Sequence, residues 1–164
     1  MSDRVARMVE EAESRIHDAD LLAESLQAQS DSQAQLKILA LEVLLKALQV
    51  KTHGRSTRTH HYADLWQSLP ADTRTKVLGV AKDRYPGHTN LGNIEKLLSV
   101  YEFIFTRARY GYELYDELSL AEQQSLGEEW VARGAPVEEA DVQYFPMELS
   151  ALLHGLCTVA RDAA

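Results

Sequence analysis

The stretch Leu39-Ala40-Leu41-Glu42-Val43-Leu44-Leu45-Lys46-Ala47-Leu48 decides the fold of this chain. Apolar residues occupy nearly every side of the helix that it predicts, and only Glu42 and Lys46 interrupt them. A helix that is apolar almost all round is stable in water only when other elements surround it. The stretch therefore predicts a central helix. Its two charges stand in the order and spacing at which glutamate and lysine pair on one helix face.

Helical spacing of apolar residues continues on both sides of this stretch. We expect an amphipathic helix over residues 5–26 before it, and Gly54 is the expected end of the central helix. Shorter patterns after it predict helices over 62–69, 72–85 and 91–108, with Asp72 as the cap of the fourth helix.

The last third of the chain carries two further helix signals. Ser119 and Glu122 fit a capping box at the start of an acidic helix. Pro146 suits the first position of a last, apolar helix. No segment alternates with a period of two. The predicted fold class is therefore all-α: a compact bundle of about five core helices, with an additional short acidic helix inserted before the last one.

Length and composition indicate one globular domain over residues 1–164, with 45% hydrophobic and 26% charged residues. No window reaches the ~20 consecutive apolar residues that a membrane span needs. The first residues lack the apolar core of a signal peptide. We therefore expect a cytoplasmic protein with no membrane partner.

The net charge of −8 is distributed unevenly along the chain. Residues 46–61 contain four cations, three histidines and no carboxylate, which favours a local site for an anion. Residues 113–148 contain ten acidic residues and one basic residue, so 114–145 is predicted to be a peripheral acidic insert. The overall acidity and the absence of a basic recognition helix argue against specific DNA binding.

A second polar feature is the segment Arg107-Ala108-Arg109-Tyr110-Gly111-Tyr112-Glu113, at the end of the fifth predicted helix. Arginine offers a planar fork of donors for phosphate or carboxylate, and tyrosine offers a ring and a hydroxyl. One interpretation pairs Arg109 with Glu113, or an arginine with the partly covered charge of Glu42. The other makes the segment the rim of a site for a nucleotide, RNA or a partner chain. The candidate ligand-binding residues are then Arg107, Arg109, Tyr110, Tyr112, Lys46 and Lys51.

Three segments together resemble the HEPN family of small helical proteins linked to nucleotides and RNA. The run from Glu42 to Leu48 resembles the E-x-x-L-K-A-L core of the family's second helix. His60 through Trp66 resembles its H-x-L-x-x-L-(W/F) segment, and Tyr101 through Tyr110 resembles a later helix that often ends in Arg-Tyr. The resemblance covers roughly residues 5–112 and the last helix, and it omits 114–145.

The resemblance implies a homodimer that binds RNA or a nucleotide in a prokaryotic defence, toxin–antitoxin or stress context, with a possible protein partner encoded nearby. Many HEPN proteins are metal-independent ribonucleases with an Arg-x4-6-His signature. Here no histidine follows Arg107 or Arg109 in range. The match of Arg55 with His60 or His61 lies between the second and third helices, the wrong place for the family's pair. The sequence therefore favours binding without the usual catalytic pair.

Two alternatives stay open. The first is an active ribonuclease with an atypical site, in which folding or dimerisation brings Arg109 to His60 or His61. The second is a structural adaptor whose acidic insert contacts a partner. No cofactor and no metal site are expected, because the sequence contains no E-x-x-H pair, phosphate loop or dinucleotide motif.

Overall fold

The computed structural model describes residues 2–27 and 30–162, and every regular element within these ranges is helical. The predicted all-α class is confirmed. The α-helices and two shorter helical turns follow one another in this order: α1 (Asp3–Leu26), α2 (Asp31–His53), α3 (Tyr62–Gln67), α4 (Ala71–Arg84), α5 (Ile94–Phe103), η1 (Ile104–Ala108), α6 (Gly111–Leu114), α7 (Leu120–Ala132), η2 (Val137–Glu139) and α8 (Pro146–Arg161).

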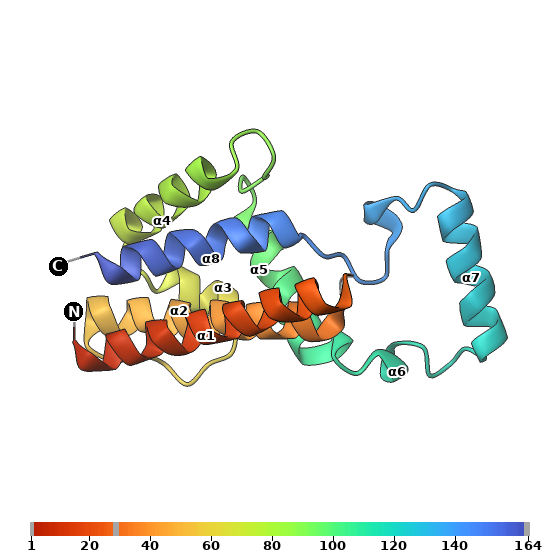
Figure 1. The fold of residues 1–164 in the computed structure, drawn as a ribbon, viewed down its shortest axis with the longest axis horizontal. Helices are drawn as coiled ribbons and strands as arrows, with labels where there is room; N and C mark the ends of the chain where they lie inside the picture. The colour runs from red at the N-terminus through yellow and green to blue at the C-terminus, as the bar shows by residue number, and fades with distance from the viewer. Residues whose placement is uncertain (1, 28–29, 163–164) are drawn as a thin grey trace.

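Helices α1, α2 and α8 form the centre of the bundle (Figure 1). α1 packs along α2, α8 packs against α2 and more lightly against α1, and α4 packs on α8. The short helix α3 contacts both α2 and α5, so it connects α5 to the centre of the bundle. None of the helices in the described ranges has the length and apolar composition of a transmembrane span.

Helix α2 is buried as its sequence predicts. Leu41, Leu44, Leu45 and Leu48 have no exposed surface, and Glu42 is only 5% exposed. Gly54 ends the helix with φ 74°, and its N–H donates to Val50 O. Glycine adopts this left-handed conformation without the clash that a Cβ would cause.

Most local helix signals in the sequence are confirmed, and two expectations are wrong. Ser119 and Glu122 form the predicted capping box, and Pro146 is the first residue of α8. The fourth helix already begins at Ala71, so Asp72 lies inside its first turn and does not cap it. The fifth helix does not stay regular to residue 108, because α5 passes into a π-helix, η1, at Ile104.

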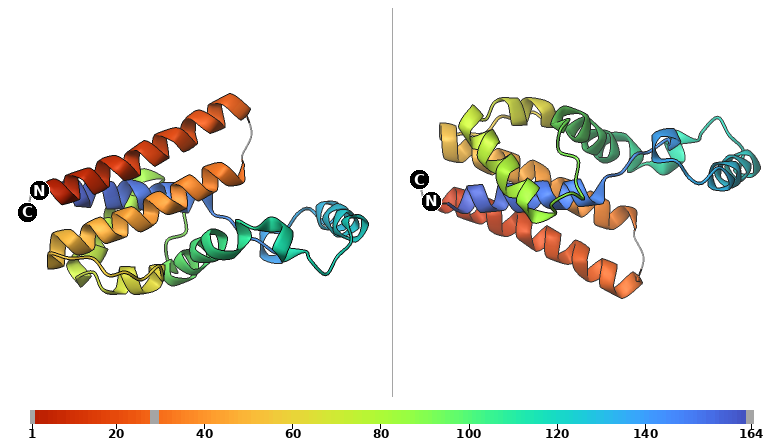
Figure 2. Two further views of the ribbon diagram at one scale, coloured as in Figure 1. Left: turned by 90° about the horizontal axis from the view of Figure 1, so that it is seen from below. Right: turned by 90° about the horizontal axis from the view of Figure 1, so that it is seen from above.

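Residues 114–145, which we call the arm, extend away from the bundle (Figures 1 and 2). No residue of the arm is buried. Within the arm, Trp130 Nε1 donates to Pro136 O at 3.0 Å, and Arg133 pairs with Glu139 at 3.2 Å. The bundle therefore holds the core, and the arm carries its acidic residues in solvent.

The contact between α4 and α8 depends on a glycine. A Cβ at Gly155 would lie 2.5 Å from Val77 O and 3.2 Å from Ala81 Cβ. We expect Gly155→Ala to lower the free energy of unfolding by about 1–3 kcal/mol, because the helices must move apart. Urea denaturation measures this. Gly79→Ala on α4 is the matched control, since a Cβ there meets nothing within 4 Å. That control is expected to raise stability by up to about 1 kcal/mol. Equal effects of the two variants would contradict the close packing.

Candidate functional site

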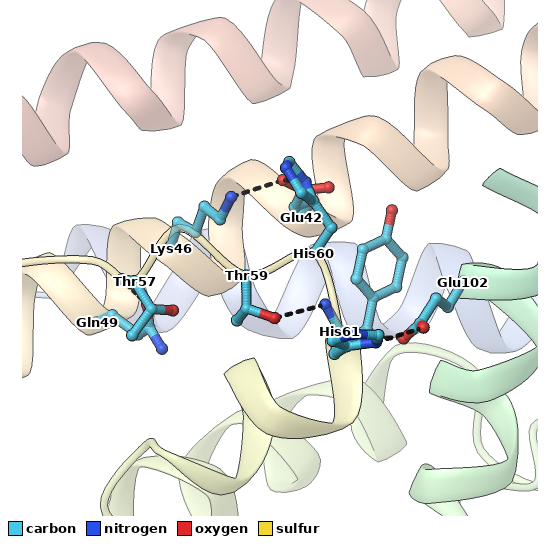
Figure 3. Close-up of polar contacts among 9 residues, drawn as sticks. Glu42, Lys46, Gln49, Thr57, Thr59, His60, His61 and Glu102 are labelled. Carbon is cyan, nitrogen blue, oxygen red and sulfur yellow. Dashed lines mark hydrogen bonds and ion pairs between the residues drawn. The ribbon is translucent and has the colours of Figure 1, made fainter. Parts of the chain in front are cut away.

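The buried carboxylate of Glu42 is the centre of a polar cluster on α2 (Figure 3). Its Oε1 accepts from Lys46 Nζ at 2.7 Å and from His60 Nδ1 at 2.8 Å. Its Oε2 is also buried and has no hydrogen-bond partner among the described residues. A buried carboxylate is costly unless opposite charges or donors compensate it. Lys46 and His60 supply that compensation.

The loop after α2 is held against the helix at a second point. Gln49 Oε1 accepts from the Thr57 backbone N–H at 3.0 Å, and Gln49 Nε2 donates to Ser68 Oγ at 2.6 Å. Gln49 is 2% exposed, so these bonds also satisfy a buried amide. The loop therefore follows α2 and delivers two adjacent histidines to the start of α3.

Each of the two histidines is oriented by a different carboxylate (Figure 3). His60 Nδ1 bonds Glu42, and His61 Nδ1 bonds Glu102 Oε1 at 2.9 Å. A carboxylate only accepts, so Nδ1 carries the proton in both rings and the lone pair of the neutral imidazole is on Nε2. The side chains are 65% and 71% exposed. Both Nε2 atoms are therefore available for proton transfer or for binding a phosphate oxygen.

Glu102 also fixes the start of α3. Its Oε2 accepts from the backbone N–H of Tyr62, the first residue of that helix, at 2.9 Å. The hydrogen bond and charge of Glu102 raise the pKa of His61 above its usual 6.5. His61 therefore carries a positive charge to a higher pH than an isolated histidine does.

Tyr62 lies between the Glu42 cluster and the aromatic rings around Arg109. Its side chain is fully buried, and its hydroxyl has no hydrogen-bond partner among the described residues. Burial raises the pKa of this hydroxyl most, the Glu42 and Glu102 charges raise it further, and Arg109 opposes them. The Tyr62 ring lies 6.5 Å from the Phe105 ring, centroid to centroid. Glu42 and Arg109 are therefore both close enough to Tyr62 for their charges to act on its hydroxyl.

The guanidinium of Arg109 lies over two aromatic rings. Its guanidinium carbon lies 5.3 Å from the Phe105 centroid and 4.8 Å from the Tyr110 centroid. The Tyr110 ring in turn meets Tyr112 edge to face at 6.1 Å. Stacking uses the faces of a guanidinium and leaves its N–H edges for a ligand. Arg107, Arg109, Tyr110 and Tyr112 are all exposed.

The π-helix η1 sets the backbone position of Arg107 and Arg109. Arg109 N donates to Ile104 O at 3.1 Å, the wider bond of a π-turn, and Gln35 Nε2 donates to the same oxygen at 3.1 Å. Such single π-turns are frequent at functional sites. A cleft of about 360 Å³ adjoins η1, within the size range of small-molecule sites. Its lining includes Gln35, Ile104, Ala108, Tyr115 and Tyr144.

Several predicted contacts do not form. Arg109 makes no ion pair with Glu113 or with Glu42 in the part of the chain that the structure describes, and Lys46 and His60 are the partners of Glu42. Lys51, expected to bind a ligand, donates to Val159 O at 2.6 Å and to Asp162 O at 2.7 Å. It thereby caps the end of α8. Arg55 is exposed in the loop after α2.

Sequence reasoning missed two residues of the site, Glu102 and Phe105. Glu102 lies on α5 and orients His61, while Phe105 lies in η1 and joins Tyr62 to Arg109. Both contacts cross between elements about 40 residues apart in the chain. A carboxylate and a ring within one turn of the Arg107–Tyr110 segment were the available signal. The helical spacing of apolar residues does not show which other element the side chains of Glu102 and Phe105 contact.

Comparison of the chain with models of protein families, with curated proteins and with solved structures finds no match. The geometry of the site is therefore the basis for the function proposed below.

The contact between His61 and Glu102 makes a pH prediction. Glu102→Gln removes the charge and weakens the hydrogen bond, so the pKa of His61 is expected to fall toward 6.5. Because the folded-state pKa is raised, this contact stabilises the fold below the unfolded pKa and loses its effect as pH rises through the folded pKa.

Titration of the His61 ring protons by NMR measures this change. Glu95→Gln is the control, since Glu95 is an exposed carboxylate on α5 that bonds Gln67. The same His61 pKa in Glu102→Gln and in the unmodified protein would contradict the contact.

Proposed function

We propose that this chain is a HEPN-like helical module, working as a homodimer, that binds RNA or a nucleotide in a prokaryotic defence, toxin–antitoxin or stress context. The observation that carries the proposal is the stacked guanidinium of Arg109, whose N–H edges have no hydrogen-bond partner among residues 2–27 and 30–162. A pre-ordered guanidinium loses little entropy when it binds phosphate.

The surroundings of Arg109 suit a nucleic-acid ligand. Tyr110 and Tyr112 supply exposed rings for a base to stack on, at 41% and 71% exposure. Arg107 adds a second exposed cation, and His61 adds a third when protonated. The cleft beside η1 offers a place for a base next to these cations. Tyr115 and Tyr144 of the arm line the same cleft, so the proposed phosphate and base contacts meet where the arm joins the bundle.

The first test is binding of a fluorescein-labelled single-stranded RNA, followed by anisotropy in EDTA. Arg107→Ala with Arg109→Ala is expected to weaken binding at least about tenfold, since each arginine–phosphate contact contributes on the order of 1 kcal/mol or more. Loss of two phosphate contacts should also reduce the slope of log K against log salt concentration by about 1.4, the value for a single strand. Lys76→Ala with Lys82→Ala is the control, because both lysines are exposed on α4. Equal losses in the two double variants, or no binding by the unmodified protein, would overturn the proposal.

A second candidate function is metal-independent RNA cleavage. The observation that favours it is the pair of carboxylate-oriented imidazoles, His60 and His61, near Arg109. One histidine takes the proton of the ribose 2′-hydroxyl and another gives a proton to the leaving oxygen, while an arginine stabilises the phosphoryl charge. This chemistry leaves a 2′,3′-cyclic phosphate and needs no metal.

Cleavage is tested with the same RNA and protein at high concentration in EDTA. His60→Ala and His61→Ala are each expected to reduce the rate about 10²–10⁴-fold, the usual contribution of a general acid or base. Lys76→Ala should leave the rate unchanged. If the RNA stays intact while a control ribonuclease cuts it, cleavage is excluded and the binding proposal stands.

A further inference from the structure

Helix α7 of the arm exposes two large apolar side chains on one side, at its two ends. Leu120 on α7 is 85% exposed and Val131 is 63% exposed, the two largest values for leucine and valine among the described residues. They are eleven residues apart, about three helical turns, so they lie on the same side of α7. Exposed apolar side chains on one face of a helix mark an interaction surface.

The central helix of the bundle leaves a second set of apolar side chains partly exposed. Leu36, Leu39 and Val43 are only half-buried, although their helix is otherwise the most buried in the protein. Their spacing of three and four residues places them together, on the side of α2 opposite Leu41 and Leu48. Figure 2 (left) shows α1 and α2 in front with α8 behind them, so the side of α2 away from α8 has no helix over it.

The charges of the two surfaces are complementary. The arm holds eight acidic residues and one basic residue, a net charge of −7. The loop that follows α2 holds Arg55 and Arg58, both exposed and without an ion pair in the described part of the chain. This loop begins where α2 ends, near the two termini, and runs back along α2 to Glu42, whereas the arm leaves from the other end of the bundle (Figure 1). The start of this loop is therefore separated from the arm of its own chain, and its cations can meet the arm of a second copy.

We propose that the arm of one copy docks on a second copy of this chain. Leu120 and Val131 of α7 cover the Leu36–Leu39–Val43 stripe, and the carboxylates of the arm face Arg55 and Arg58. A two-fold axis makes the exchange reciprocal, so both arms are used and the assembly closes as a dimer. The inference rests on the dimer of the proposed function and names the surface that holds it together.

The apolar and charged parts of this contact have different effects. Exposed ion pairs contribute little affinity each, but they select the partner and set the salt dependence. A helix face laid into an apolar groove supplies most of the affinity. Substitutions of Leu120 and Val131 should therefore change the dissociation constant most, and charge reversals should change which copies pair.

The first experiment measures the oligomeric state of the full chain by sedimentation equilibrium. The unmodified protein is expected to be dimeric at about 20 μM, a concentration well above the Kd of a standard-sized interface. Leu120→Ser with Val131→Ser should raise the dimer Kd at least about tenfold. Both side chains are exposed, so the bundle keeps its fold, and circular dichroism checks this. Leu21→Ser, at 46% exposure on α1, is the matched control and should leave the Kd unchanged.

The second experiment exchanges the charges. Glu128→Lys with Glu129→Lys reverses part of the arm, and Arg55→Glu with Arg58→Glu reverses the loop. Each double variant should pair poorly with itself, while a mixture of the two should form heterodimers. A monomeric unmodified protein, unchanged dimers in the arm variants, or a mixture that does not pair would overturn the inference. RNA binding by Arg107 and Arg109 is measured separately, so an unaffected dimer in the arm variants would leave the binding proposal intact.

Discussion

The burial of the Glu42 carboxylate is the constraint on which the arrangement of this surface depends. A carboxylate that is 5% exposed needs compensating donors, because an unpaired buried charge costs several kcal/mol. Lys46 compensates it from the same helix, and His60 does so from the loop. The loop must therefore cross α2 at residue 42. That crossing places His61 and Tyr62 against α5, where Glu102 accepts from both of them.

From Tyr62 outward, the site is a series of ring contacts. The buried Tyr62 ring meets Phe105, and the Arg109 guanidinium lies over both the Phe105 ring and the Tyr110 ring. Each member of the series restricts the next, so an exposed guanidinium is ordered through contacts that begin in the core. The π-turn at Ile104, bonded by Gln35 of α2, holds the backbone of the same segment. Such preorganisation lowers the entropy lost on binding.

The sequence predicts the fold well because the relevant signals are local. The apolar run of α2 encodes its own burial, and helix geometry alone pairs Glu42 with Lys46. The site is predicted less completely. The candidate residues Arg109, His60 and His61 lie around Tyr62. The carboxylate partner of His61 comes from another element, α5, and the contact of Phe105 with Tyr62 also crosses between elements. The π-turn is not readable either, since its extra donor, Gln35, lies 69 residues away.

The arm poses a thermodynamic problem that the bundle does not. Ordering a backbone residue costs roughly 1–2 kcal/mol in conformational entropy, and the bundle offsets this cost by burying its core. Only the end of the arm near α8 packs on the core, through Val142, Tyr144 and Phe145. No residue of 114–145 is fully buried, and the part around α7 has a capping box, a Trp130–Pro136 hydrogen bond and a few exposed polar contacts. These interactions are individually worth about 1 kcal/mol or less in water. The remaining compensation must come from surface outside the arm. The bundle of the same chain contacts only the ends of the arm and leaves α7 uncovered. In the dimer proposed above, a second copy supplies α7 with an apolar surface and with cations.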